Sequence, residues 1–340
     1  MEEINTIGLD LAKSVFQVHG ADASGAPVLR KKLRRDAVLG FFARLAPCVV
    51  AMEACASAHY WAREIARFGH TTKLIPANYV KPFVKRQKND AADAEAICEA
   101  ALRPTMRFVA PKSEAQQASA VVFRARDLLV RQRTQIINAL RGHLAEFGIV
   151  APKGPAHTKT LLRALEEQTA MPQALAPLRS LATTLAALEQ QIATLDAEIA
   201  ARAKQDDVAR RLMSVPGIGP VIATAITALA PPAETFSKGR DFAAWLGLVP
   251  RQHSSGGKDR LGRTTKMGER SLRRLLIIGA NAVVRWAVRN PPPAGSWLAR
   301  MLARKPRQLV TVALAGKMAR IAWALMAKGG VYRASDAVAA

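Results

Sequence analysis

The first hundred residues follow an order of strand-like and helix-like segments that restricts the fold of this part more than any other feature. The expected elements are strands at 4–9, 14–19 and 27–33, a helix at about 36–45, a strand at 48–52, a helix at about 58–68, a strand at 72–75 and a helix from residue 90. Such an order suits a mixed sheet with helices on its faces. A doubly wound nucleotide-binding domain would need a glycine-rich phosphate loop after the first strand, and GLDLAK (8–13) is no such loop.

Four acidic residues stand where a metal site could use them. Asp10 follows the first apolar run, and Glu53 ends the run PCVVAM (47–52). Asp90 and Asp93 are three residues apart, so they share one face if their segment is helical. A single Asp beside a tight connection is equally well explained as a turn residue. Together, however, the four carboxylates form a hard-oxygen set that suits Mg²⁺ or Mn²⁺.

The charge of the chain points to a polyanionic partner. Among 340 residues, 50 Lys and Arg stand against 26 Asp and Glu, which gives a net charge of +24. Cations that neutralise phosphates release condensed counterions, so nucleic acid is the favoured partner. An anionic membrane is the alternative, but no apolar run of about 20 residues, secretory signal or lipidation motif is found, and we expect no membrane association. Three cysteines without CxxC spacing fit a reducing cytoplasm.

Two basic runs lie between the second expected strand and the acidic helix, RKKLRR (30–35) and KPFVKRQK (81–88). A charge run is often only a solvated face. In a chain this basic, we expect these runs to contact a nucleic-acid backbone.

From about residue 113 to 203 the pattern becomes helical, with a basic amphipathic stretch first and a break at 148–154. A heptad seam follows, in steps of three and four: Leu178, Leu181, Leu185, Leu188, Ile192, Leu195 and Ile199. It predicts a coiled coil. An intramolecular antiparallel pair with the preceding helix is one explanation; self-association is slightly favoured.

The C-terminal part is predicted to be helical around one basic loop. Two short helices flanking PGIG (216–219) resemble a helix-hairpin-helix element, whose exposed N–H groups would suit a phosphate, although a plain helical connector has the same pattern. The segment 251–270 is rich in Gly, Ser, Lys and Arg and reads as a loop, before an apolar helix at 272–288. Helices near 297–304 and 308–326 close the chain.

These motifs resemble a known family when they are taken in order. GLDLAK, VVAMEACASAHYW and KNDAADAEAI are similar to the RuvC-like, RNase H-type domain of the DEDD transposases of the bacterial insertion-sequence one-ten group, also called bridge recombinases. LVPRQHSSGGKDRLGRTTKMGERSLRRLL resembles the C-terminal transposase domain of that family and its serine motif. The resemblance implies a RuvC-like DEDD catalytic domain at 1–110, a helical and coiled-coil linker at 111–206, and a C-terminal transposase domain at 207–330.

The resemblance also implies a reaction. The four acids would hold two Mg²⁺ (or Mn²⁺) ions in the first domain, and these would activate a serine delivered by the second, in a composite site that forms a covalent protein–DNA intermediate. In the family the nucleophile directly precedes glycine, so Ser255 fits and Ser254 does not. His253 is a poor candidate for a base. The basic residues around the serine could hold the scissile phosphate; they are Lys258, Arg260, Arg263, Lys266 and Arg270.

The partners implied by the family are element-end and target DNA, a structured non-coding guide RNA and further copies of the chain in a dimer or tetramer. The expected location is the bacterial cytoplasm, at the nucleoid when acting. Two alternatives stay open. One is a RuvC-like, metal-dependent junction nuclease without a serine adduct, and the other is a non-catalytic DNA-binding protein.

Overall fold

A computed structural model describes residues 3–85, 89–152, 154, 157–167 and 172–333 of the chain. The chain divides into two compact units, 1–117 and 118–340, and each is described by itself. The first is a mixed α/β unit and the second is mostly helical, as the sequence predicts.

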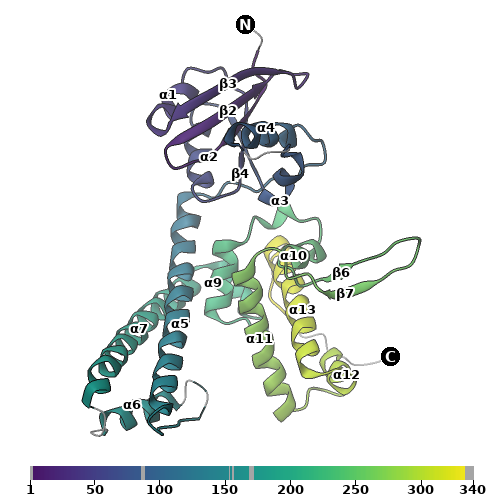
Figure 1. Cartoon of the computed structure of the whole chain (residues 1–340). Coiled ribbons are helices and arrows are strands. Elements are labelled where there is room, and N and C mark those ends of the chain that lie inside the picture. Colours follow the sequence, from purple (N-terminus) through teal and green to yellow (C-terminus); the bar gives the residue numbers. More distant parts are fainter. Residues whose placement is uncertain (1–2, 86–88, 153, 155–156, 168–171, 334–340) are drawn as a thin grey trace. The chain divides into compact units, whose positions relative to one another are not determined.

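The first unit is built on a five-stranded mixed sheet, seen in purple and blue in Figure 1. Its strands are β1 (Thr6–Asp10), β2 (Val15–Ala21), β3 (Pro27–Arg34), β4 (Val49–Glu53) and β5 (Thr71–Ile75), in the order β3-β2-β1-β4-β5. The first three form an antiparallel meander, whereas β4 and β5 run parallel to β1. All five lie within a few residues of the predicted segments, because alternating apolar residues mark a half-buried strand.

Helices cover both faces of this sheet. On one face, α1 (Val38–Phe42) and α2 (Ala58–Ala66) enclose a core that includes Phe16, Val50 and Trp61. On the other, α4 (Asp90–Ala101) packs against β1, together with α3 (Ala77–Val80) and the 3₁₀ turn η2 (Lys81–Phe83). The helix expected at 36–45 is only a 3₁₀ turn, η1 (Arg35–Ala37), followed by the short α1. Residues 86–88 of the second basic run lie outside the described residues.

α4 approaches the sheet at Gly8, on β1. A Cβ built on Gly8 would lie 2.1 Å from the carbonyl oxygen of Ala94 and 2.5 Å from the amide of Cys98. Only glycine permits this backbone contact. The contact sets α4 directly over the end of β1.

The helical part of the chain begins with a hairpin of two long helices. α5 (Glu114–Ala145) and α7 (Pro172–Gln205) are linked through α6 (Thr158–Glu166) and lie side by side (Figure 1). Arg126 of α5 contacts both carboxylate oxygens of Asp196 on α7, at 2.5 and 3.2 Å.

The hairpin of α5 and α7 buries part of the heptad seam within the single chain. Every seventh residue of the seam is buried within the single chain, at 0–5% exposure; these residues are Leu178, Leu185, Ile192 and Ile199. Leu178 and Leu185 share a core with residues of α5 and α6, and Ile199 with the beginning of α5. The intramolecular alternative therefore explains these four residues, since periodicity does not specify which helix covers an apolar stripe. Leu181, Leu188 and Leu195 are only partly buried, and self-association through the seam stays a prediction.

The remaining helices surround one large core. They are α8 (Asp207–Leu212), α9 (Pro220–Leu229), η4 (Ala233–Thr235), α10 (Gly239–Trp245), α11 (Arg270–Arg289), α12 (Trp297–Arg304) and α13 (Arg307–Lys328). α13 is long and apolar enough for a membrane span, a test that core helices also pass. Its residues Ala315, Ala319 and Ala322 are completely buried in the core of this unit.

The segment predicted to be a basic loop contains a β-hairpin instead. β6 (Pro250–Gln252) and β7 (Leu261–Thr264) pair antiparallel and project from the helices of their unit (Figure 1). Sequence patterns missed these strands because they are three and four residues long and lack a buried apolar face.

Candidate functional site

Three of the four predicted acids meet at the end of β1. Asp10 is the last residue of this strand, and Asp90 and Asp93 lie in the first turn of α4. Asn89 caps α4, with its side chain accepting a hydrogen bond from the amide of Ala92 at 2.8 Å. One carboxylate oxygen from each of the three Asp residues lies within 4.8 Å of the others. The spacing of the helical acids and the contact of α4 with β1 together produce the cluster.

Glu53 lies beside this cluster and is not part of its tight group. It ends β4, which runs parallel to β1 with Met52 opposite Leu9. Parallel neighbours end at the same edge of a sheet, so Glu53 stands next to Asp10. Its charge is close enough to raise the pKa of Asp10.

The electrostatics of the cluster favour a bound cation. Burial, first of all, and the negative charges of Asp93, Asp90 and Glu53 together raise the pKa of Asp10 from 3.8 to about 6. Like charges held this close are unfavourable unless a proton or a metal ion compensates them. Oxygen ligands of this kind suit Mg²⁺ or Mn²⁺. The residues present therefore fit the divalent metal that the sequence predicts.

A cavity of about 340 Å³ lies between β2, β3 and the first turns of α4, and its lining includes Asn89, the cap of that helix. Gln17 on β2 lies directly opposite Asp10 on β1, and Lys32 on β3 lies opposite Gln17. Residues opposite each other in a sheet project from the same face, so this polar row is continuous with Asp10. Gln17 and its neighbour His19 are only 8% and 7% exposed. Sequence reasoning missed both; the only signal was the placing of polar residues at alternate positions of β2.

The predicted nucleophile lies at the tip of the β6–β7 hairpin. Ser255 pairs with Lys258, whose amide donates to the carbonyl oxygen of Ser255 at 3.1 Å. Between them, Gly256 and Gly257 both have positive φ, 56° and 74°. Two central residues with positive φ define a type I′ turn, which matches the twist of a hairpin. The glycine after Ser255 is therefore required by the turn itself.

The two neighbouring serines differ in what their hydroxyls do. Ser254 donates to a carboxylate oxygen of Asp259 at 2.9 Å and accepts from the amide of Arg260 at 3.2 Å. It also accepts from the side-chain amide of Gln252 at 3.0 Å. The hydroxyl of Ser255, in contrast, makes no hydrogen bond within the described part of the chain, and the residue is exposed. The hydroxyl of Ser254 thus joins the two sides of the hairpin, whereas that of Ser255 has no such structural role.

The base of the hairpin is fixed to its unit by backbone contacts that only glycine permits. A Cβ on Gly268 would lie 1.8 Å from the carbonyl oxygen of Trp245, and one on Gly247 would lie 2.0 Å from that of Met267. Arg273 donates to the carbonyl oxygens of Leu246 and Met267 at 3.0 and 3.2 Å. An exposed tip thus extends from a rigid base.

The predicted basic residues are distributed along this hairpin and its return to α11. All five are exposed, and none makes an ion pair within the described residues; they are Lys258, Arg260, Arg263, Lys266 and Arg270. His253 donates its backbone amide to the carbonyl oxygen of Arg260 at 2.8 Å, and its ring lies against Gly262.

The segment that resembles a helix-hairpin-helix has a packing role. Gly217, with φ +88°, approaches α11 so closely that a Cβ on it would lie 2.8 Å from the carbonyl oxygen of Gly279. A Cβ on Gly279 would in turn lie 2.1 Å from the carbonyl oxygen of Gly217. Gly219 is the N-cap of α9, and a Cβ built on it would meet nothing within 4 Å. The first glycine is thus explained by packing, as the connector alternative expects, and phosphate binding at the second stays a prediction.

Comparison with known proteins places the chain among the transposases. Residues 7–149 match a family model of DEDD transposases of the IS110 type, and residues 209–293 match the transposase IS116/IS110/IS902 family. The chain is 51% identical over 334 residues to a probable family 20 transposase of Pseudomonas aeruginosa, covering 97% of this chain and 99% of that protein. It is 40% identical to the transposase for insertion sequence element IS1328 of Yersinia enterocolitica, covering 98% of this chain and 99% of that one. For the transposase of IS1111A from Coxiella burnetii, identity is 37%, with 98% and 92% covered.

Identity at this level over almost the whole length defines the class of the protein, a transposase of insertion sequences. The chain belongs to the IS116/IS110/IS902 family, the insertion-sequence one-ten group that the sequence motifs resemble.

Proposed function

We propose that this transposase cuts and rejoins DNA through a covalent intermediate on Ser255, supported by divalent metal ions at Asp10, Glu53, Asp90 and Asp93. The observation that carries the proposal is the contrast at the hairpin tip. Ser254 is used for structure, whereas Ser255 presents an exposed hydroxyl without a hydrogen bond on a rigidly based arm.

The acid cluster has a separate role in this account. Asp10, Asp90 and Asp93, with Glu53 beside them, would hold Mg²⁺ or Mn²⁺. When bound, such ions stabilise the charge on the attacking and leaving oxygens of a phosphodiester. The protein itself fixes the carboxylates by the end of β1 and the capped first turn of α4. The strand order β3-β2-β1-β4-β5 supports an RNase H-type, RuvC-like assignment for this unit.

A covalent bond between the serine and the DNA phosphate keeps the energy of the broken phosphodiester bond for rejoining. The serine oxygen bonds to phosphorus, the bond from phosphorus to one strand oxygen breaks, and that oxygen leaves with a proton. Rejoining reverses these changes with an incoming hydroxyl group. Lys258, Arg260, Arg263, Lys266 and Arg270 are available to hold the phosphates on either side, because they are exposed and carry no ion pair among the described residues.

The partners of the chain follow from its family and its charge. A transposase binds DNA, and the net charge of +24 suits element ends and target DNA. A structured non-coding guide RNA, a homo-oligomeric assembly and action in the bacterial cytoplasm are part of the proposal and rest on the family resemblance. The three-part division at 1–110, 111–206 and 207–330 is likewise proposed.

The main alternative is a RuvC-like nuclease that uses the same acids with water as the nucleophile. An experiment separates the two by following both products. The full-length protein, with its copurifying RNA, is incubated with element-end DNA with and without Mg²⁺, and is then denatured. We expect Mg²⁺-dependent strand cleavage with part of the DNA linked to protein. Cut DNA without any linked protein favours the nuclease. If no metal-dependent cutting occurs, the non-catalytic DNA-binding protein becomes the better explanation.

A further inference from the structure

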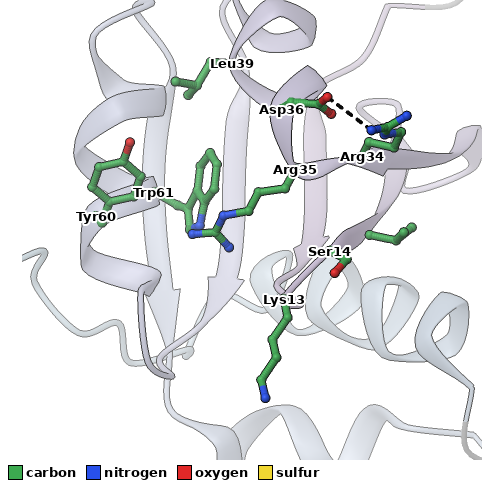
Figure 2. A pocket seen from close by; sticks show the side chains of 9 residues that line it. Lys13, Ser14, Arg34, Arg35, Asp36, Leu39, Tyr60 and Trp61 are labelled. Atoms are coloured by element: carbon green, nitrogen blue, oxygen red, sulfur yellow. Dashed lines mark ion pairs between the residues drawn. The ribbon is translucent and has the colours of Figure 1, made fainter.

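A second cavity, of about 810 Å³, lies on the face of the sheet opposite the acids. Its wall contains Trp61 of α2, which belongs to the core formed by α1 and α2, whereas Asp10 lies on the α4 face. The cavity is nevertheless at the same end of the sheet, because Lys13 follows β1 and Arg34 ends β3. Figure 2 shows the side chains that line it.

The cavity carries a net positive charge that is not used inside the protein. Arg34 pairs with Asp36 at 3.6 Å. Lys13 and Arg35 are exposed and form no ion pair within the described residues. Arg34 and Arg35 are the end of the basic run RKKLRR, so the structure directs this part of the run into the cavity, whereas Arg30 faces Glu95 on α4.

Aromatic side chains hold one of these cations in a defined orientation. The guanidinium of Arg35 lies 5.1 Å from the ring centre of Trp61 and 5.8 Å from that of Phe16. Figure 2 shows Arg35 extended toward the indole. Arg35 donates one long hydrogen bond, of 3.4 Å, to the carbonyl oxygen of Ala12. Its other in-plane N–H groups stay available when the guanidinium lies over a ring, and these match the geometry of a phosphate.

The aromatic wall of the cavity has one buried and one exposed ring. Trp61 is 3% exposed, and its indole Nε1 is covered by protein without a hydrogen-bond acceptor within the described structure, so it does not face a ligand in the cavity. The ring of Tyr60 stands 5.3 Å from that of Trp61, edge to face, and Tyr60 is 41% exposed. An exposed ring beside a cationic site is a platform on which an unpaired base can stack.

We propose that this cavity binds a single-stranded phosphodiester chain, with one phosphate at Arg35, another at Lys13 and an unpaired base on Tyr60. The inference deepens the proposed function and rests on it, since it assigns the path of a strand next to the acids. Lys13 follows Asp10 by three positions, and such a segment spans at most about 11 Å. A strand that reaches the acids is therefore unpaired within a few nucleotides of them, because a base held in a duplex cannot stack on Tyr60.

The first test removes the cations one at a time. Binding of fluorescent single-stranded DNA and RNA oligonucleotides to the full chain is measured from low to high salt after copurifying nucleic acid has been washed off. Lys13→Ala and Arg35→Gln should each weaken binding roughly three- to ten-fold and reduce the slope of log affinity against log salt by about 0.7, the value for one phosphate of a single strand. Arg44→Gln is the matched control, because Arg44 is exposed in the same unit and does not line this cavity. It should leave the slope unchanged.

The second test examines the aromatic groups. Tyr60→Ala should weaken binding of a normal oligonucleotide about five-fold or more and should hardly affect an oligonucleotide without bases. Trp61→Phe keeps a buried ring next to the guanidinium of Arg35, so the fold should be retained and the affinity for both oligonucleotides should fall less than in Arg35→Gln.

The outcomes separate this proposal from the proposed function. Loss for DNA alone, for RNA alone or for both supports the cavity and identifies the source of the strand. Unchanged affinity and slope in Lys13→Ala and Arg35→Gln, or a loss confined to duplex DNA, overturns it, even if wild type still forms a covalent adduct. Conversely, Lys13→Ala and Arg35→Gln could weaken binding as expected while wild type forms no covalent adduct. That result supports the cavity and contradicts the serine mechanism.

Discussion

The acid cluster makes the ionised form of Asp10 unfavourable. The Asp10 carboxylate is half-buried and faces the charges of Asp93, Asp90 and Glu53, which together with burial raise its pKa to about 6. The folded state therefore binds a proton more tightly than the unfolded state. Stability is reduced as the pH rises from 3.8 towards 6 and stays reduced above 6, unless a cation compensates the charge.

The first prediction is that Asp10→Asn stabilises the metal-free protein at pH 7.5. The gain should be about 1–2 kcal/mol, after allowing for the solvent around a half-buried group. It should shrink as the pH falls below about 6 and vanish below about 4, where Asp10 is protonated in both states. Urea unfolding of both proteins in EDTA across this range provides the measurement.

Adding Mg²⁺ supplies the control for this prediction. Wild type should be stabilised by the ion, and Asp10→Asn should not, because a ligand that binds only the folded state shifts its stability by mass action. Equal stabilisation of both proteins by Mg²⁺ would place the metal elsewhere.

At the scale of elements, glycines fix how helices and the hairpin are joined. The contact of Gly217 with Gly279 brings the turn between α8 and α9 against α11, at a distance that leaves no room for a methyl group. In the Pro216–Gly219 segment, Gly217 therefore serves the packing of this turn against α11.

The second prediction follows from that contact. Gly279→Ala should destabilise the fold by about 1–3 kcal/mol, because the new methyl group would meet the carbonyl oxygen of Gly217. Gly142 is the matched control, since it lies in α5 and a Cβ there meets nothing within 4 Å. Gly142→Ala should be neutral or stabilising by up to about 1 kcal/mol. The measurement is the midpoint temperature of thermal unfolding of the two variants. Equal midpoints for Gly279→Ala and Gly142→Ala would contradict the packing role of Gly279.

The third prediction concerns the hairpin of α5 and α7. Leu185 is fully buried in a core that includes residues of α5 and α6, so Leu185→Ala should cost about 2–5 kcal/mol. The mass of the folded protein in solution should not change. Light scattering at a temperature where the variant stays folded would show a smaller particle if Leu185 joined two chains instead.

These elements show what the sequence could and could not predict. Strand periodicity located the sheet, and acids at the end of β1 and at the start of a helix predicted a cluster that β1 and α4 do bring together. Periodicity did not say that α7 would be covered by its own chain, because an apolar stripe does not name its partner. The β6–β7 hairpin was missed since it is exposed on all sides, and Gln17 and His19 were missed since two polar residues on a strand carry no motif.

At the scale of the whole molecule, the residues proposed for the two kinds of chemistry lie in separate units. The acids lie in the unit 1–117, and Ser255 lies in the unit 118–340. Each set is arranged by its own local structure, the acids by a sheet end and a capped helix, the serine by a type I′ turn. The central claim is that a single transposition reaction needs both.

The most direct measurement compares wild type, Ser255→Ala and Ser254→Ala for a covalent protein–DNA adduct. Each protein is incubated with element-end DNA, Mg²⁺ and the copurifying RNA, and the denatured sample is examined for a protein-linked strand. Ser255→Ala removes one exposed oxygen without a hydrogen bond, so folding and DNA affinity should be unchanged while the adduct disappears. Ser254→Ala loosens the hairpin and should keep a substantial part of the adduct. An adduct of normal yield from Ser255→Ala would contradict the account.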